Sequence, residues 1–107
     1  MADKRSQAGM AALVEQLELF QLIFDNIPSG AMITTPGGIV THLNKPYAQF
    51  LGIDVAGSIG RHCTEVVENT RMHVVGATGV AEINQIQMIR GQNIVVHRIP
   101  LKMGGRV

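Results

Sequence analysis

The chain of 107 residues contains one cysteine, one tyrosine, three phenylalanines and no tryptophan. A single cysteine excludes a disulfide within the chain, and so few aromatic rings leave little surface on which nucleic acid bases can stack. The nine lysine and arginine residues are nearly balanced by eight aspartate and glutamate residues, and they are spread along the chain without a cluster. We therefore predict no direct contact with nucleic acid.

Long apolar runs are absent as well. No segment reaches the roughly 20 apolar residues that a membrane-spanning helix needs. The apolar stretch 9–14 near the N-terminus ends at Glu15, too early for a secretory signal. The sequence predicts a cytoplasmic protein without a membrane segment. With 46% hydrophobic residues, a chain of this length suits one folded domain.

Apolar residues recur at intervals of three and four near the N-terminus, the spacing that keeps them on one face of a helix. This stripe consists of Met10, Leu13, Leu17, Phe20, Phe24 and Ile27. We predict an amphipathic helix within residues 1–26, because Pro28 pushes the residue before it out of helical conformation. The apolar face requires a partner, either the domain itself or the same helix of a second copy. The candidate dimer contacts are Leu13, Leu17, Phe20 and Phe24.

The hydrophobic period then changes, and residues 30–44 predict two short strands joined by a turn at Thr35–Gly38. Pro36 suits the first central position of a type II turn, and Gly37 suits the positive φ of the second. A second hairpin is predicted from the Ile- and Val-rich segments 80–90 and 93–101, with a turn at residues 90–92.

Short helices are predicted between the two hairpins. Asn44 can cap a helix that ends at Gly52, and Asp54 can cap a further short turn. Thr64 can cap a longer helix that runs to about Ala77. The predicted order is helix, two strands, several short helices, two strands, which is an α+β fold.

The segments "IFDNIPSGAMITTPGGIVTHLNKPYAQFLGI" and "IGRHCTEVV", followed by a hairpin that ends in "RIPL", resemble a PAS domain. More narrowly, they are similar to the N-terminal sensory PAS modules of bacterial sigma-54-dependent transcriptional activators. The resemblance implies a five-stranded antiparallel sheet with helices on one face. Since only four strands are predicted, we expect the core, residues 27–107, to be truncated before the fifth. We expect the central gap to be closed by rearrangement of the sheet or by a segment of another copy, which favours a homodimer.

The resemblance also implies a function. A sensory PAS module binds a small ligand and passes the change through helix or dimer rearrangement to an output, here an ATPase and a DNA-binding domain further along the protein. The alternative is a PAS dimerisation module that binds no ligand. We find no pairing of nucleophile and base, so we predict no catalytic residues and no enzymatic activity.

A group of residues falls on the strands and helices that would enclose a PAS ligand pocket. These pocket candidates are Met32, Phe50, Leu51, Met72, His73, Val75, Ile86 and Met88. They are either the lining of a pocket or ordinary core. With Arg71, His73 either belongs to a solvated helix face or meets the carboxylate of a small metabolite.

The segment "GRHC" around Cys63 resembles part of the flavin-binding motif of photosensory PAS domains. His62 and Thr64, however, replace the asparagine and the arginine of that motif, and Ile86 and Val96 stand where flavin-binding asparagines are found. Without those amides a flavin would be buried with unsatisfied polar groups, at roughly 1–3 kcal/mol each. We therefore expect no flavin and interpret Cys63 as a small buried core residue.

The four histidines, His42, His62, His73 and His97, show no short ligand spacing such as i and i+4. The sequence therefore predicts no metal site. His73 lies on the helix that carries the haem ligand in some PAS sensors, but the segments that surround haem in those proteins are not recognisable here. The cofactor, if any, is left unknown by the sequence.

Overall fold

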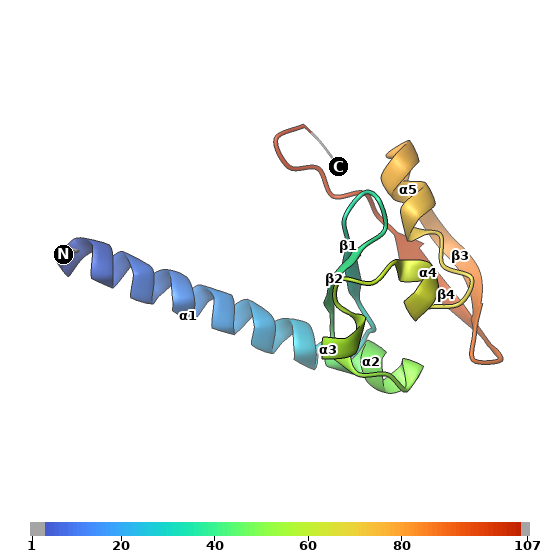
Figure 1. The fold of residues 1–107 in the computed structure, drawn as a ribbon, viewed down its shortest axis with the longest axis horizontal. Coiled ribbons are helices and arrows are strands. Elements are labelled where there is room, and N and C mark those ends of the chain that lie inside the picture. Colours follow the sequence, from blue (N-terminus) through green and yellow to red (C-terminus); the bar gives the residue numbers. More distant parts are fainter. Residues whose placement is uncertain (1–3, 106–107) are drawn as a thin grey trace.

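The structure is a computed structural model that describes residues 4–105, and it contains one long helix attached to a compact mixed α+β body (Figure 1). The elements are α1 (Lys4–Asn26), β1 (Met32–Thr34), β2 (Val40–Leu43), α2 (Lys45–Leu51), α3 (Val55–Ser58), α4 (Cys63–Val66), α5 (Met72–Thr78), β3 (Glu82–Ile89) and β4 (Gln92–Arg98). The predicted fold class, α+β with antiparallel strands and helices, is confirmed.

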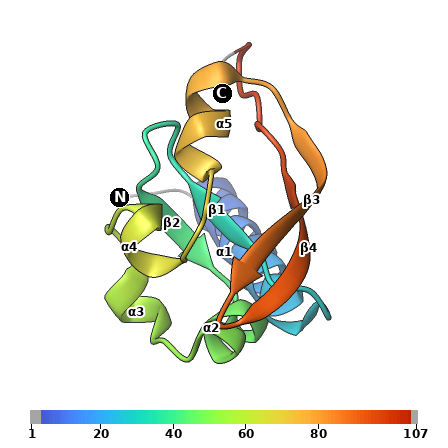
Figure 2. The same cartoon turned by 90° about the vertical axis from the view of Figure 1, so that its right-hand side faces the viewer.

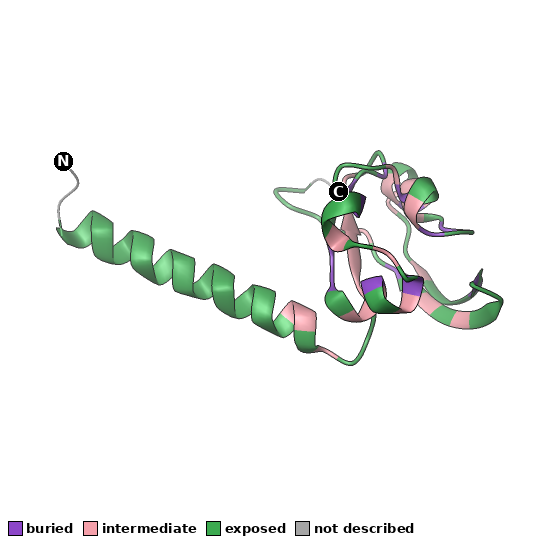
Figure 3. Ribbon diagram, turned by 60° about the horizontal axis from the view of Figure 1, so that its bottom comes forward, coloured by how far each residue is buried: buried purple, intermediate pink, exposed green. Residues whose placement is uncertain are grey.

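Helix α1 ends at Asn26, as predicted, and projects away from the body (Figure 1). Its apolar stripe is open to solvent, with Leu17 60% and Phe20 63% exposed. Only near its C-terminal end is the helix partly covered, where Phe24 and Asp25 are half-buried (Figure 3). In the single chain, most of the apolar face of α1 is therefore not buried against its own domain. Within the described residues, no helix is long and apolar enough to cross a membrane.

The first hairpin pairs β1 with β2 in antiparallel register, with Met32 opposite Leu43. Its turn is closed by a hydrogen bond from the Gly38 N–H to the Thr35 carbonyl, at 2.9 Å. The positive φ lies at Gly38 (94°) and not at Gly37, where a type II turn would have put it. The difference follows from a register shift just before the turn, since a hairpin loop with a bulge needs a positive φ at its last residue.

The capping signals of α2 are confirmed. The Asn44 side chain accepts a hydrogen bond from the Tyr47 N–H at 3.1 Å, Pro46 lies in the first turn, and Gly52 ends the helix with φ 70°. Asp54 lies at the N-terminus of α3, but its side chain makes no capping hydrogen bond, contrary to the prediction.

The predicted helix from Thr64 to Ala77 is divided in two, α4 and α5. His62 caps α4 in place of Thr64, because its Nδ1 accepts a hydrogen bond from the Thr64 N–H at 3.3 Å. Between the helices, Val67 is extended and Asn69 adopts a positive φ of 59°, which short polar side chains tolerate. The predicted stop at Gly79 is confirmed as the C-cap of α5.

The second hairpin pairs β3 with β4 in antiparallel register, with Ile89 opposite Gln92. Arg90 and Gly91 both have positive φ, which is typical of a tight two-residue turn matched to the twist of its strands. The two hairpins form separate two-stranded sheets within residues 4–105 and stand beside each other (Figure 2).

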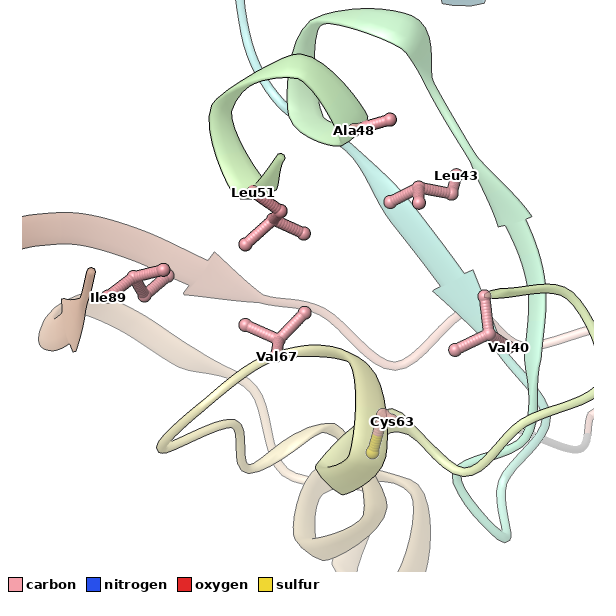
Figure 4. Packing of buried hydrophobic residues seen from close by; sticks show 7 residues of the cluster. All are labelled: Val40, Leu43, Ala48, Leu51, Cys63, Val67 and Ile89. Atoms are coloured by element: carbon pink, nitrogen blue, oxygen red, sulfur yellow. The ribbon is translucent and has the colours of Figure 1, made fainter. Parts of the chain in front are cut away.

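The hydrophobic core joins both hairpins to the short helices. It consists of Val40, Leu43, Ala48, Leu51, Cys63, Val67 and Ile89 (Figure 4). The predicted interpretation of Cys63 as a buried core residue is confirmed, since its side chain is 0% exposed.

Candidate functional site

An open cavity of about 840 Å³ lies between β1 and β4 and is bordered by α2 and by the start of α5. Apolar side chains that line it include Met32, Phe50, Met72, Ile94 and Val96. Polar side chains that line it include Tyr47, Thr70, Gln87, His97 and Arg98. The volume is within the range of small-molecule sites, roughly 300–1,000 Å³, and a mainly apolar wall with a few polar groups is typical of them.

Arg98 is the one fully charged residue among the described residues that line the cavity, and it is buried. Its Nη2 donates to the Gln87 side-chain oxygen at 2.8 Å, and its Nη1 donates to the Glu82 carboxylate at 2.8 Å. Gln87 in turn donates to the Glu68 carbonyl at 2.8 Å. These contacts hold the guanidinium in a fixed position at the cavity wall.

Glu82 connects this arginine to a second one. Arg71, just before α5, donates to the Glu82 carboxylate through Nη2 at 2.9 Å and Nε at 3.0 Å. The hydrogen bonds from Arg71, followed by the charges of Arg71 and Arg98, hold the pKa of Glu82 below its ordinary value. Two guanidinium groups therefore share one carboxylate, and the group of Arg71, Glu82 and Arg98 carries a net positive charge beside the cavity.

Tyr47 supplies a neutral hydroxyl at the same cavity. Burial raises the pKa of its phenol, although the positive charge of Arg98 opposes the change. Its ring packs against Gly30, where an added Cβ would lie 2.8 Å from the ring. A larger residue at position 30 would therefore displace the ring from the cavity wall.

Three of the predicted pocket residues, Met32, Phe50 and Met72, line this cavity. Leu51 and Val75 are instead buried in the interior and do not reach it. They lie on α2 and α5 as expected, but their side chains face the packed side of each helix.

Ile86 and Met88 differ from the expectation more strongly, because they are 63% and 52% exposed and do not line the cavity. Side chains alternate between the two faces of a strand, and in β3 Gln87 and Ile89 are the residues that point inward. Gln87 is held inward by Arg98, so a polar residue takes the position for which an apolar one was predicted.

The sequence analysis did not predict the polar residues that line the cavity, above all Arg98 and Gln87. The available signal was the polar Gln87 within an apolar strand and the arginine of the "RIPL" segment, both of which suit a buried polar pair.

His73 lies outside the cavity and meets two other residues of the chain. Its Nδ1 is 3.7 Å from the Cys63 sulfur, and its ring contacts the His62 ring edge-on with centroids 5.3 Å apart. One potential ligand atom from each of these three residues lies within 4.8 Å of the others. This cluster was not expected, because the three residues do not show a short ligand spacing in the sequence.

A sequence profile described as "PAS domain" matches residues 18–84, more than half of the chain. The chain belongs to the PAS domain family. Its fold is similar to the crystal structure of the PAS domain of an HTR-like protein from Haloarcula marismortui, with a TM-score of 0.66. That similarity covers 94% of this chain and 91% of the other at 16% identity, so it concerns the PAS fold alone.

A curated relative of this PAS domain is "Sensor protein CitS" from Halalkalibacterium halodurans, 27% identical over 89 residues. The match covers 81% of this chain but only 16% of that protein. PAS domains are generally sensory, and this relative agrees with a sensory domain. The narrower resemblance to sigma-54-dependent activators rests on the sequence segments quoted above and stays a prediction.

Proposed function

We propose that this PAS domain is a regulatory sensor that binds a small molecule with an anionic group in the cavity between β1 and β4. The observation that carries the proposal is the buried Arg98 in a cavity of about 840 Å³ with an otherwise largely apolar lining. A guanidinium offers a planar pair of donors to a carboxylate or phosphate, and a low-polarity wall strengthens the contact. The apolar residues Met32, Phe50 and Met72 would hold the rest of the molecule.

Ligand binding at Arg98 would affect α5 through the Glu82 carboxylate. An anion at Arg98 competes with the Glu82 carboxylate, which now lies 2.8 Å from Nη1. Glu82 also binds Arg71 at the start of α5, so a carboxylate displaced from Arg98 can shift together with Arg71. A ligand shifts such an equilibrium only by its difference in affinity for the two arrangements, commonly 1–3 kcal/mol.

The output end of the domain is proposed to be α1. Asn44 donates to the Phe24 carbonyl at 2.9 Å and accepts from the Ala31 N–H at 2.8 Å, which ties the end of α1 to the start of the strand that borders the cavity. We propose that Leu13, Leu17 and Phe20 of two copies pack together in a homodimer and that ligand binding changes their packing.

The protein as a whole is proposed to be a cytoplasmic transcriptional regulator, in which a sigma-54-dependent ATPase and a DNA-binding domain follow this segment. In that arrangement the segment contacts neither DNA nor membrane and has no catalytic role. The uncovered apolar face of α1 also favours a second candidate, a dimerisation module with no ligand.

Native mass spectrometry of the purified chain, compared with a denatured sample, separates the two candidates. A bound molecule adds mass that disappears on denaturation, and an absorption spectrum of the same sample identifies haem or flavin. We expect the added mass in the unmodified chain and in Arg61→Met, an exposed arginine paired with Glu65. We expect its loss in Arg98→Met and in Met72→Trp, which fills the cavity and keeps the arginine.

Folding of each variant is checked by circular dichroism before the masses are compared. A folded Met72→Trp protein that retains the same added mass would contradict ligand binding in this cavity. A dimer with no added mass, from cells grown on several carbon sources, would favour the dimerisation module.

A further inference from the structure

The side chains of His62, Cys63 and His73 form a cluster that the proposed sensor function does not use. His62 caps α4, Cys63 is the first residue of α4, and His73 lies in the first turn of α5. Because the chain between the two helices turns back, residues separated by up to eleven positions in the sequence meet in space. The Cys63 sulfur lies 3.7 Å from His73 Nδ1, and one ligand atom of each residue is within 4.8 Å of the others.

These distances are close to those of a tetrahedral metal site. Zinc binds sulfur at about 2.3 Å and imidazole nitrogen at about 2.0–2.1 Å, which separates the two ligand atoms by about 3.5 Å. The contact between Cys63 and His73, at 3.7 Å, already meets this spacing. Since all three ligand atoms lie within 4.8 Å of one another, the widest separation has to close by up to about 1.4 Å.

We propose that His62, Cys63 and His73 bind a divalent metal ion of the zinc type, with a water molecule or an external ligand in the fourth position. Thiolate and imidazole are the ligands that zinc prefers over the hard cations calcium and magnesium. The thiol of Cys63 releases its proton to solvent as the ion binds. The proposal is independent of the cavity, since none of the three residues lines it.

Burial of the three residues suits an ion that enters from one side. Cys63 is 0% exposed and belongs to the core, whereas His62 and His73 are half-buried at its edge. The sulfur is therefore held in place by packing, and the imidazole side of the cluster is where the fourth ligand and the ion have access.

The surroundings of His62 provide the hydrogen bonds that orient a metal-binding imidazole. Its Nδ1 accepts from the Thr64 N–H, so Nε2 carries the proton and donates to the Gly37 carbonyl at 3.1 Å. When one ring nitrogen binds an ion, the other carries the proton and still has an acceptor. That acceptor is either the Gly37 carbonyl or the Thr64 hydroxyl, which lies 2.7 Å from Nδ1.

Gly38 keeps the space between the two imidazole rings open. A Cβ at this position would lie 2.7 Å from His62 Nε2 and 2.9 Å from His73 Cβ. Its carbonyl also accepts from the Cys63 N–H at 2.7 Å, which fixes the turn of the first hairpin against the cluster. An ion held here would join that turn to α4 and α5.

Cobalt(II) is the probe that tests the site, because a cobalt–thiolate bond absorbs in the near ultraviolet. Titration of the complete chain under reducing conditions is expected to give this band with one cobalt per chain, and zinc is expected to abolish it by displacement. Cys63→Ser is expected to remove the band. His73→Asn keeps the thiol and is expected to weaken cobalt binding about tenfold or more.

His42→Asn is the matched control, because His42 is an exposed histidine on β2 outside the cluster, and it is expected to bind cobalt as the unmodified chain does. Circular dichroism verifies the fold of each variant. Cobalt absorption without a thiolate band would overturn the proposal, as would a folded His73→Asn protein with unchanged affinity.

Discussion

Asn44 is a fully buried polar residue whose side chain connects three parts of the fold. Its Nδ2 donates to the Phe24 and Ser29 carbonyls, both at 2.9 Å, and its Oδ1 accepts from the Ala31 and Tyr47 N–H groups at 2.8 and 3.1 Å. A primary amide can make two donor and two acceptor contacts, so every hydrogen-bonding group of the side chain is used. The asparagine thus holds α1, β1 and α2 together.

Replacement of Asn44 by alanine is expected to lower the free energy of unfolding by about 3 kcal/mol. The lost bonds contribute roughly 0.5–1.5 kcal/mol each, and the carbonyls near the surface regain part of that from water. Urea unfolding at neutral pH measures the difference. Asn93→Ala, at an exposed position of β4, is the control and is expected to change the stability by less than about 0.5 kcal/mol. Equal midpoints for the two variants would contradict this role of Asn44.

Glu82 gives the domain a specific pH dependence. Because hydrogen bonds from Arg71 lower its pKa in the folded state, the ionised carboxylate stabilises the fold above its ordinary pKa. The contribution is lost as the pH falls through the lowered value. Glu82→Gln is therefore expected to melt at a lower temperature than the unmodified chain at neutral pH, and the difference is expected to shrink in acid.

Melting temperatures measured from neutral to acidic pH test this expectation. Glu65→Gln is the control, since Glu65 pairs with an exposed Arg61 at i−4 and such a pair contributes little. A difference between the Glu82 variant and the unmodified chain that stays constant through the acidic range would show that its charge is not the cause.

At the scale of elements, local signals in the sequence could be predicted and long-range contacts could not. As helix caps, Asn44, Gly52 and Gly79 make contacts within one turn of the helix that they begin or end, so residue type and spacing identify these caps. The break between α4 and α5 depends on distant partners. Gln87 donates to the Glu68 carbonyl at 2.8 Å, and Asn69 donates to the Met88 carbonyl at 2.9 Å.

The candidate sites also differ in whether local signals or long-range contacts determine them. Met32, Phe50 and Met72 were predicted to line a pocket because the PAS resemblance fixes which elements enclose it. Arg98 and the cluster at Cys63 were missed, since the first requires knowledge of the strand register and the second requires the turn between two helices.

At the scale of the whole molecule, the exposed apolar face of α1 has no partner within the described residues of a single chain. The helix extends far from the body (Figure 1), and its exposed apolar residues form a continuous stripe with the 3.6-residue period of a helix. Two such stripes packed against each other would bury their side chains, at about 25 cal/mol for each Å² removed from water. This is the physical basis for the proposed homodimer.

The double variant Leu17→Glu, Phe20→Glu is expected to convert the dimer into a monomer, because it would place four carboxylates in the apolar interface of two helices. Analytical ultracentrifugation over a range of protein concentrations measures the change. Ala8→Glu is the control for the added charge, since position 8 lies on the opposite side of the helix from Leu17 at 100° per residue. It is expected to stay dimeric. An unmodified chain that sediments as a monomer at every concentration would contradict pairing through α1, and so would a double variant that dimerises as tightly as the control.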